Sequence, residues 1–400
     1  MTSDGNRMLG GLLEVNHLSA MEDLPGRIAE YARAAGLSRT LIYVADLQQQ
    51  NLVPLPGQGD AAGRPLRPLR IDGTLPGRAF RDVKVVRAAG GEATRRLWVP
   101  VLDGTERVGV LGVTVPRAAP EAETLAVRLA SLIALLVVSK RPHSDSHARR
   151  VRARPMSVSA EVLWSLLPPG TFANDKVVVS AALEPAYEVG GDAYDFAIDG
   201  DTLHVSIFDA MGHDTSAGLT STVAVGAGRS SRRQGADLPA TSRAIDAAIA
   251  GEFTGRFATG ILADLDLRTG RLNWVNRGHH PPLVIRDGRK VAALDGKPDP
   301  PMGIGLDLVT GLLHYQLEPG DRLVFYTDGI VEARSPDGEV FGLQRFVDFI
   351  VRREADGMSA PETLRRLIQN ILEHQREGLQ DDATVLTVEW ASRRHRQLTL

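Results

Sequence analysis

Four aspartates stand at the ends of predicted strands, each beside glycine, alanine or another small residue. The run "VVVSAALEPAYEVGGD" reaches Asp192, "LHVSIFDA" carries Asp209, "RLVFYTDGI" carries Asp328, and "QDDATVLTVEW" carries Asp381 near its start. A single aspartate after a strand is commonly a turn residue or a helix N-cap, and Asp328-Gly329 alone fits an ordinary turn. Four such positions in one region favour a shared site, because a strand end holds a carboxylate rigidly.

Converging carboxylates of this kind repel one another and raise each other's pKa. A divalent cation removes that cost, and Mg²⁺ and Mn²⁺ both prefer oxygen ligands. The sequence contains no cysteine, which excludes thiolate metal sites, disulfides and cysteine nucleophiles. The aspartates therefore predict a carboxylate site for Mg²⁺ or Mn²⁺.

The stretch "GHHPP", residues 278–282, invites a second metal hypothesis through its adjacent histidines. Neighbouring residues of a strand point to opposite faces, so His279 and His280 cannot easily bind one ion, and metal binding here is disfavoured. Asp195 and Asp382 lie close in sequence to the predicted ligands. We expect both to form hydrogen bonds around the metal ligands rather than to bind metal themselves.

The region from about Ser157 to the C-terminus must position these carboxylates. It opens with a helix, "SAEVLWSLLP", and continues with a series of β-like runs separated by turn signals such as Thr269-Gly270. Helices are predicted from Thr215 to about Ser230, from Leu238 to about Gly251, and twice near the C-terminus. Hairpin-joined strands with helices between them predict an α/β (α+β) fold, with a mostly antiparallel two-sheet β-sandwich flanked by helices.

Residues 1–140 form a separate region of mixed patterns. An amphipathic helix ending at Gly36 is followed by the strand-like run "TLIYVADL". The runs "RRLWVPVLD" and "RVGVLGVTV" are joined by a hairpin signal, and a helix is predicted from Glu121 to about Lys140. This order predicts a small α+β sensor domain. The polar, basic segment Lys140–Pro155 predicts a linker, with a membrane-surface or nucleic-acid role as the less favoured alternative.

The bulk composition is that of a soluble globular protein, with 43% hydrophobic residues, 24% charged residues and a formal net charge of −3. This near-neutral balance gives no case for nucleic-acid binding. No basic head precedes an apolar run at the N-terminus, so no secretory signal is expected. The longest apolar run, "LIALLVVS", is short of the roughly 20 residues that span a bilayer. We therefore expect a soluble, cytoplasmic protein with no membrane partner.

Five motifs carry a resemblance to a known family: "EVGGDAYDF", "IFDAMGHDTSAGL", "NRGHHPPLVI", "VFYTDGIVEAR" and "QDDATVLTV". Their order and spacing resemble the PPM-type (PP2C-like) metal-dependent protein serine/threonine phosphatases, in the bacterial branch of sporulation and stress sigma-factor regulators. The resemblance covers about Ser159–Trp390. The N-terminal region resembles a GAF sensor domain. The implied organisation is a GAF-like domain over 1–140, a linker and connecting helix over 141–170, and a PPM-type phosphatase domain over 171–392.

The resemblance implies two Mn²⁺ or Mg²⁺ ions at one end of the β-sandwich. It places metal ligands on Asp192, Asp209, Asp328 and Asp381, with Asp209 bridging the ions and a main-chain carbonyl ligand at Ala210. The ions would hold a shared water, deprotonate it and direct it in line at the phosphorus of phosphoserine or phosphothreonine. The four aspartates would thus be catalytic through the bound metals, and no protein nucleophile is needed.

The chain departs from the eukaryotic relatives at two positions. Their histidine two residues after the bridging aspartate is replaced by Met211, and His213 follows two residues later. His213 is a general-acid candidate, with a loop histidine of no chemical role and proton transfer from metal-bound water as alternatives. Those relatives also hold phosphate with an arginine upstream of the first aspartate. The stretch "SAALEPAYEVGGD" has none, which predicts phosphate binding mainly by metal and water.

The order of sensor domain, connecting helix and metal phosphatase implies a regulated hydrolase. The substrate implied by the resemblance is a phosphorylated anti-sigma-factor antagonist or a similar small phosphoprotein. The GAF-like domain would take a small-molecule signal or dimerise, so a homodimer is compatible with the sequence. Two alternatives stay open: a catalytically silent signalling scaffold of the same fold, and a hydrolase of small phosphoesters. The presence of all four aspartates disfavours the first.

Overall fold

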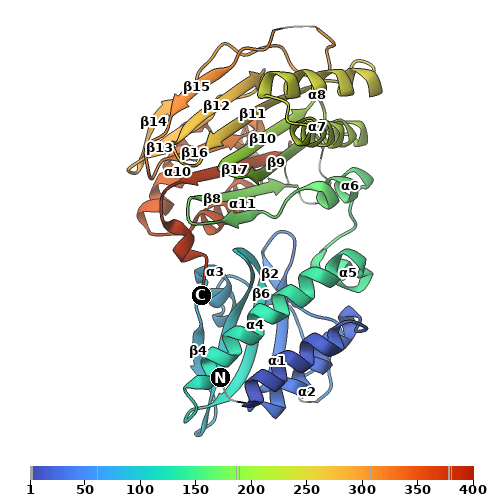
Figure 1. The fold of residues 1–400 in the computed structure, drawn as a ribbon, viewed down its shortest axis with the longest axis vertical. Helices are drawn as coiled ribbons and strands as arrows, with labels where there is room; N and C mark the ends of the chain where they lie inside the picture. Colours follow the sequence, from blue (N-terminus) through green and yellow to red (C-terminus); the bar gives the residue numbers. More distant parts are fainter. Residues whose placement is uncertain are drawn as a thin grey trace. The chain divides into compact units, whose positions relative to one another are not determined.

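The computed structural model describes residues 3–60, 62–185, 187–188, 190–306, 309–376, 379 and 381–400. The chain divides into two compact units (Figure 1). One comprises Met1–Pro155 together with Arg396–Leu400, and the other comprises Met156–His395. Each unit buries hydrophobic clusters of its own.

The N-terminal unit is built on one six-stranded antiparallel sheet, in the order β3-β2-β1-β6-β5-β4. The hairpin predicted at residues 103–106 joins β5 to β6, and Asp103 pairs with Glu106. Gly104 takes a positive φ of 56°, which this tight turn requires and glycine adopts readily. The strands are β1 Ser38–Ala45, β2 Asn51–Pro54, β3 Leu69–Arg70, β4 Val86–Ala89, β5 Thr94–Asp103 and β6 Glu106–Pro116.

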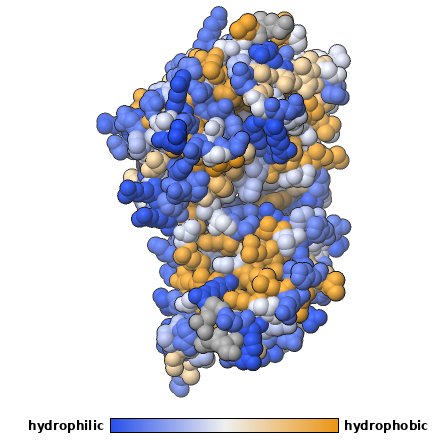
Figure 2. Space-filling model, viewed as in Figure 1, coloured by the Kyte–Doolittle hydropathy of each residue, from blue (hydrophilic) through white to orange (hydrophobic). Residues whose placement is uncertain are grey.

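Helices cover this sheet, and α4 is the longest of those described. It lies against β5 and β6 and buries Leu129, Ile133 and Val137. The helical segment Glu121–His143 is long and apolar enough to cross a membrane, because its most apolar stretch has a mean hydropathy of 1.8. Half of that stretch is buried inside the protein, as is usual for a core helix. Figure 2 shows hydrophobic residues over α4 on one face of the unit. The α-helices are α1 Ser3–Asn16, α2 Leu24–Ala34, α3 Leu75–Asp82, α4 Glu121–Lys140 and α5 Asp145–Val151.

The segment Lys140–Pro155, predicted to be a linker, is in part folded. It contains the 3₁₀ helix η2 (Arg141–His143) and α5, whose N-terminus is capped by the Ser144 side chain. Val151 is buried in the N-terminal core, and its carbonyl accepts a 3.0 Å hydrogen bond from the Leu47 amide. The prediction of a linker missed helix α5, whose single buried residue is Val151. One apolar residue among charged ones does not produce the repeating apolar spacing by which a helix is recognised in a sequence.

The C-terminal unit contains two antiparallel sheets, which confirms the predicted sandwich. Their orders are β15-β12-β11-β10-β9 and β14-β13-β16-β17-β8-β7, and residues of both sheets, such as Ile207 and Leu386, share one core. The strands are β7 Thr171–Ala173, β8 Val177–Glu184, β9 Asp192–Asp199, β10 Thr202–Ala210, β11 Ala258–Asp266, β12 Arg271–Arg277, β13 Leu283–Arg286, β14 Arg289–Ala293, β15 Leu313–Gln316, β16 Arg322–Tyr326 and β17 Ala383–Trp390.

Helices flank both sheets of the sandwich (Figure 1). Helices α7 and α8 contact the five-stranded sheet, whereas α11 contacts β8 and β17 of the six-stranded sheet. Asp214 and Asp237 cap α7 and α8, since each carboxylate accepts a backbone N–H from the first turn. The α-helices are α6 Val158–Leu166, α7 Thr215–Arg233, α8 Leu238–Glu252, α9 Asp328–Val331, α10 Leu343–Ala355 and α11 Ala360–Gln375.

Candidate metal centre

The five-stranded sheet places two of the predicted ligands side by side. Asp192 begins β9, Asp209 lies one residue before the end of β10, and the two are direct partners in the antiparallel ladder. Directly opposed residues of a ladder project from the same face of a sheet, so the two carboxylates share one face. The backbone is tightly packed here, because a Cβ on Gly191 would lie 2.1 Å from the Ala210 carbonyl oxygen. This close approach explains why glycine precedes Asp192.

The six-stranded sheet supplies the other two predicted ligands. Asp328 begins α9 just after β16, and Asp381 precedes β17. Strands β16 and β17 are paired, and Gly329 packs directly on the chain before β17, since a Cβ there would lie 1.9 Å from the Asp382 carbonyl oxygen. Asp328 and Asp381 therefore lie at neighbouring points on one end of this sheet.

Hydrogen bonds tie the two sheets together at this end. The Thr327 hydroxyl donates to Asp192 Oδ2 at 2.7 Å and accepts the Thr384 N–H at 2.9 Å. The Asp382 carboxylate accepts the backbone N–H groups of Gly190, Gly191 and Asp192 at 3.0, 2.6 and 3.0 Å. Asp382 thus braces the turn that carries Asp192, as expected from the sequence.

The electrostatics of the cluster agree with this proximity. Burial, followed by the charges of Asp209 and Asp382, raises the pKa of Asp192 well above its usual value, against the hydrogen bond from Thr327. Burial, followed by three neighbouring carboxylates, raises the pKa of Asp209 to about 7. Burial is also the main cause of the raised pKa of Asp381 and of Asp382. The cluster therefore concentrates negative charge that a divalent cation would neutralise.

The donor atoms fit Mn²⁺ or Mg²⁺ in type. Both ions prefer carboxylate and carbonyl oxygens, and Mg²⁺ usually retains several waters instead of taking an all-protein cage. In the part of the chain that the structure describes, no group of three or more His, Asp or Glu side chains is arranged closely enough to hold an ion by itself. An ion and water ligands would therefore have to complete any metal site that these carboxylates form.

His213 lies at the edge of this cluster. It is exposed in the loop between β10 and α7, and a Cβ on Gly190 would lie 2.7 Å from its Cα. Its charge also acts on Asp381, whose pKa it lowers against the larger effect of burial. The structure thus brings the general-acid candidate beside the predicted ligands, at a position open to solvent.

Arg256 is a basic residue beside the loop after Asp209 whose position the sequence did not reveal. Its guanidinium donates to the Met211 carbonyl at 3.0 Å and to Asp214 Oδ2 at 2.6 Å. It therefore lies against the loop that follows Asp209 and Ala210. Arg256 lies far from Asp209 in sequence, because helices α7 and α8 separate β10 from β11, and the pairing of these two strands brings it to this loop.

Asp195 does not brace the metal ligands, which corrects the expectation from the sequence. It lies three residues after Asp192 on β9, and alternation along a strand places the two side chains on opposite faces. Its carboxylate instead accepts hydrogen bonds from Arg229 and Arg232 of α7. Arg229 also donates to the Leu166 carbonyl at the end of α6, at 2.8 Å. Asp195 thus joins β9, α6 and α7.

The paired histidines follow β12 in a loop instead of lying on a strand. His279 is buried, and its two ring nitrogens lie 2.8 Å from Thr259 Oγ1 and 3.1 Å from the Tyr326 carbonyl oxygen. The His280 ring stacks on Tyr326, with 5.6 Å between ring centroids. Both ring nitrogens of His279 therefore have hydrogen-bond partners, and neither is left to bind a metal ion. A shared metal ion is disfavoured for this reason, and strand alternation does not apply because the histidines lie in a loop.

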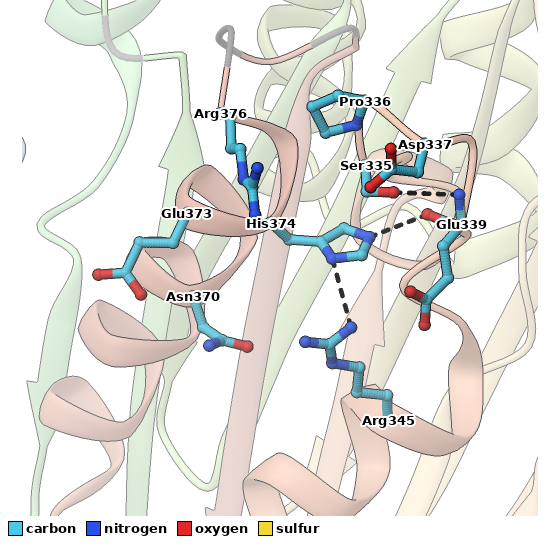
Figure 3. A pocket seen from close by; sticks show the side chains of 9 residues that line it. All are labelled: Ser335, Pro336, Asp337, Glu339, Arg345, Asn370, Glu373, His374 and Arg376. Atoms are coloured by element: carbon cyan, nitrogen blue, oxygen red, sulfur yellow. Dashed lines mark hydrogen bonds between the residues drawn. The ribbon is translucent and has the colours of Figure 1, made fainter.

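A polar pocket of about 320 Å³ lies beside α11 (Figure 3). Figure 3 shows the His374 ring between Arg345 and Glu339: Nε2 donates to the Glu339 carbonyl at 3.0 Å, and Nδ1 accepts from Arg345 at 3.3 Å. Acidic and basic side chains are mixed along its wall. The described residues that line it include none of the predicted metal ligands, so this pocket is distinct from the cluster.

Three curated relatives match parts of the chain. Protein IcfG of Synechocystis sp. is 29% identical over 133 residues, which are 33% of this chain and 20% of the relative. Phosphoserine phosphatase RsbP of Bacillus subtilis is 26% identical over 165 residues, 40% of this chain and 41% of the relative. Phosphoserine phosphatase RsbU of the same organism is 23% identical over 237 residues, 58% of this chain and 69% of the relative. The chain thus spans less than half the length of the first two.

A protein family also matches the C-terminal unit. Residues 199–391 match the family described as Stage II sporulation protein E (SpoIIE). The matched range includes Asp209, Asp328 and Asp381 and begins after Asp192. With the two-sheet fold, this match confirms the resemblance carried by the sequence motifs: residues 199–391 of this chain are similar to the SpoIIE family.

Proposed function

We propose that the chain is a Mn²⁺- or Mg²⁺-dependent protein serine/threonine phosphatase. The observation that carries this proposal is the placement of Asp192, Asp209, Asp328 and Asp381 at one end of a SpoIIE-type sandwich. The raised pKa values of Asp192, Asp209 and Asp381, together with the oxygen donors of all four side chains, suit a pair of hard divalent ions. Two of the curated relatives carry the name phosphoserine phosphatase, which supports the same reaction.

The residues would divide the work between holding the ions and handling the phosphate. The four aspartates and the Ala210 carbonyl would hold two ions, with Asp209 between them. When bound, the ions would supply an acidic water and neutralise charge on the phosphoryl oxygens. Arg256, at the loop after Asp209, would bind a phosphoryl oxygen, and exposed His213 would donate a proton to the leaving serine or threonine oxygen.

The proposed substrate is a small regulatory phosphoprotein, such as a phosphorylated anti-sigma-factor antagonist, in the cytoplasm. The N-terminal unit would act as a GAF-like sensor that takes a small-molecule signal or forms a homodimer. Its state would reach the phosphatase through residues 140–170, since Leu166 at the end of α6 is bonded to Arg229, which also binds Asp195 of β9. A chain lacking residues 1–155 should change turnover several-fold, and unchanged turnover would contradict this coupling.

The direct test is Mn²⁺-dependent release of phosphate from a phosphoserine protein, compared with Asp209→Asn and Asp328→Asn. Loss of activity in both variants is expected. Undiminished activity in both would refute the metal assignment. Hydrolysis of p-nitrophenyl phosphate without any hydrolysis of phosphoprotein would favour a small-molecule phosphoesterase, and wild-type protein inactive on both would favour a silent scaffold.

A further inference from the structure

His279 forms a buried hydrogen-bonded link between the two sheets. Its Nε2 faces the Tyr326 carbonyl oxygen, which can only accept, so Nε2 must carry a proton. Burial lowers the pKa of His279 to about 3, so the ring is neutral and Nδ1 accepts from the Thr259 hydroxyl. The tautomer is thereby determined, and both nitrogens have partners.

The two ends of this link lie beside two different predicted ligands. Thr259 of β11 is the direct ladder partner of Asp209 on β10. Tyr326 ends β16, two residues before Asp328. The imidazole therefore connects the strand next to Asp209 with the chain segment that leads into Asp328, across the interior of the sandwich.

The surroundings of His279 leave it little freedom to move. Buried Asn276 accepts the His279 N–H at 2.8 Å and donates to its carbonyl at 3.0 Å, which fixes the backbone of this residue. The Tyr326 ring is held between His280 and Phe346, with centroid distances of 5.6 and 5.2 Å. A rigid side chain that is hydrogen-bonded at both ends fixes the distance between the two segments it joins, here β11 and the end of β16.

We propose that His279 is a positioning residue that sets the separation of Asp209 and Asp328 and thereby the affinity of the site for its divalent ions. This inference rests on the proposed function. Side chains that orient metal ligands without touching the metal typically change metal affinity by about 10–100-fold when they are replaced. His279 acts through Thr259 and Tyr326, so its effect falls on ion binding, while contacts to the substrate protein are unchanged.

Three substitutions separate the two ends of the link. His279→Asn places an amide near the position of Nδ1 and keeps a partner for Thr259, whereas His279→Gln places an amide near Nε2 and keeps a partner for Tyr326. Thr259→Val removes only the hydroxyl and is the mildest change. The matched control is His204→Asn, the same replacement at a histidine of β10 that lies outside this link, five residues before Asp209.

The measurements are Mn²⁺ affinity by titration calorimetry, and kcat and KM on a phosphoserine protein at saturating Mn²⁺. We expect Mn²⁺ binding weakened about 10–100-fold in the three site variants, KM within about threefold of wild type, and no change in His204→Asn. If Thr259→Val and one of the two His279 variants both fold and both bind Mn²⁺ as tightly as the wild type, the inference about His279 is overturned, while the proposed function is unaffected. Wild-type protein that binds neither Mn²⁺ nor Mg²⁺ would overturn the proposed function and the inference with it.

Discussion

The hydroxyl of Thr327 donates a 2.7 Å hydrogen bond to Oδ2 of Asp192, which joins the end of β16 in one sheet to the start of β9 in the other. The same oxygen accepts the backbone N–H of Thr384 on β17. Thr327 is fully buried, and Asp192 is nearly so. The bond therefore stabilises the charged form of a carboxylate that burial would otherwise drive toward protonation.

Replacing Thr327 by valine should destabilise the protein and weaken metal binding. The change keeps the side-chain shape but leaves the Thr384 N–H and one Asp192 oxygen without this partner. An unsatisfied buried group costs about 1–3 kcal/mol. Urea unfolding should show that loss, and calorimetry should show weaker Mn²⁺ binding. Thr327→Ser keeps the hydroxyl and should remain near wild type; equal stability of the valine and serine variants would contradict the role of this bond.

Replacing Gly329 by alanine should disturb the site through its backbone. The added Cβ would meet the Asp382 carbonyl oxygen at 1.9 Å, so the chain before β17 must shift. Overpacking of this kind costs about 1–3 kcal/mol. Because Asp382 braces the turn of Asp192, Mn²⁺ binding should weaken as well. Gly311→Ala is the control, since nothing lies within 4 Å of a Cβ there; matching thermal midpoints and Mn²⁺ affinities for the two variants would count against this packing argument.

The sequence predicted those features that depend on local patterns. Apolar alternation and turn residues located the strands that carry Asp192, Asp209, Asp328 and Asp381, and helical periods located α4, α7 and α8. These signals are local because strand and helix periods, turns and caps involve residues close together in the chain. The placement of aspartates at strand ends then followed without knowledge of which strands pair.

Features that depend on distant pairing were not predictable in this way. Arg256 reaches the loop after Asp209 only because β11 pairs with β10, and His279 links Thr259 to Tyr326 only because the two sheets face each other. Asp195 was expected, from its proximity in sequence, to form hydrogen bonds around the metal ligands, but strand alternation turns its side chain toward α7. Sequence neighbours on a strand are not spatial neighbours unless their separation is even.

Arg256→Ala should raise KM for the phosphoprotein about tenfold while Mn²⁺ affinity stays at the wild-type value. The guanidinium contacts the Met211 carbonyl and Asp214, so its charge lies against the loop that follows Asp209, and an arginine binds phosphoryl oxygens strongly. Inorganic phosphate should inhibit the variant less strongly. Arg268→Ala, which removes an exposed arginine near Asp201, is the control. A normal KM in Arg256→Ala, with phosphate inhibition intact, would exclude Arg256 from phosphate binding.

Asp209→Asn should stabilise the protein in the presence of EDTA, and the gain should depend on pH. The pKa of Asp209 is raised from 3.8 to about 7 by burial and by neighbouring carboxylates, so the folded state binds this proton more tightly than the unfolded state. The favourable contribution of the Asp209 side chain to the free energy of unfolding is thus fully present below about pH 4, and it is lost as the pH rises through about 7. At pH 8 the charged side chain costs up to about 4 kcal/mol, which asparagine avoids.

Thermal melts of wild type and Asp209→Asn between pH 5 and pH 8.5 would test this expectation. In EDTA the variant should melt higher at pH 8, and the difference should shrink toward pH 5. In millimolar Mn²⁺ the order should reverse, because a bound cation neutralises the Asp209 charge in the wild type and ligand binding stabilises the folded state. Asp348→Asn, at a half-buried position of α10 outside the cluster, should show neither effect. Parallel pH profiles for wild type and Asp209→Asn, unaffected by Mn²⁺, would mean that Asp209 is not part of a charged metal site.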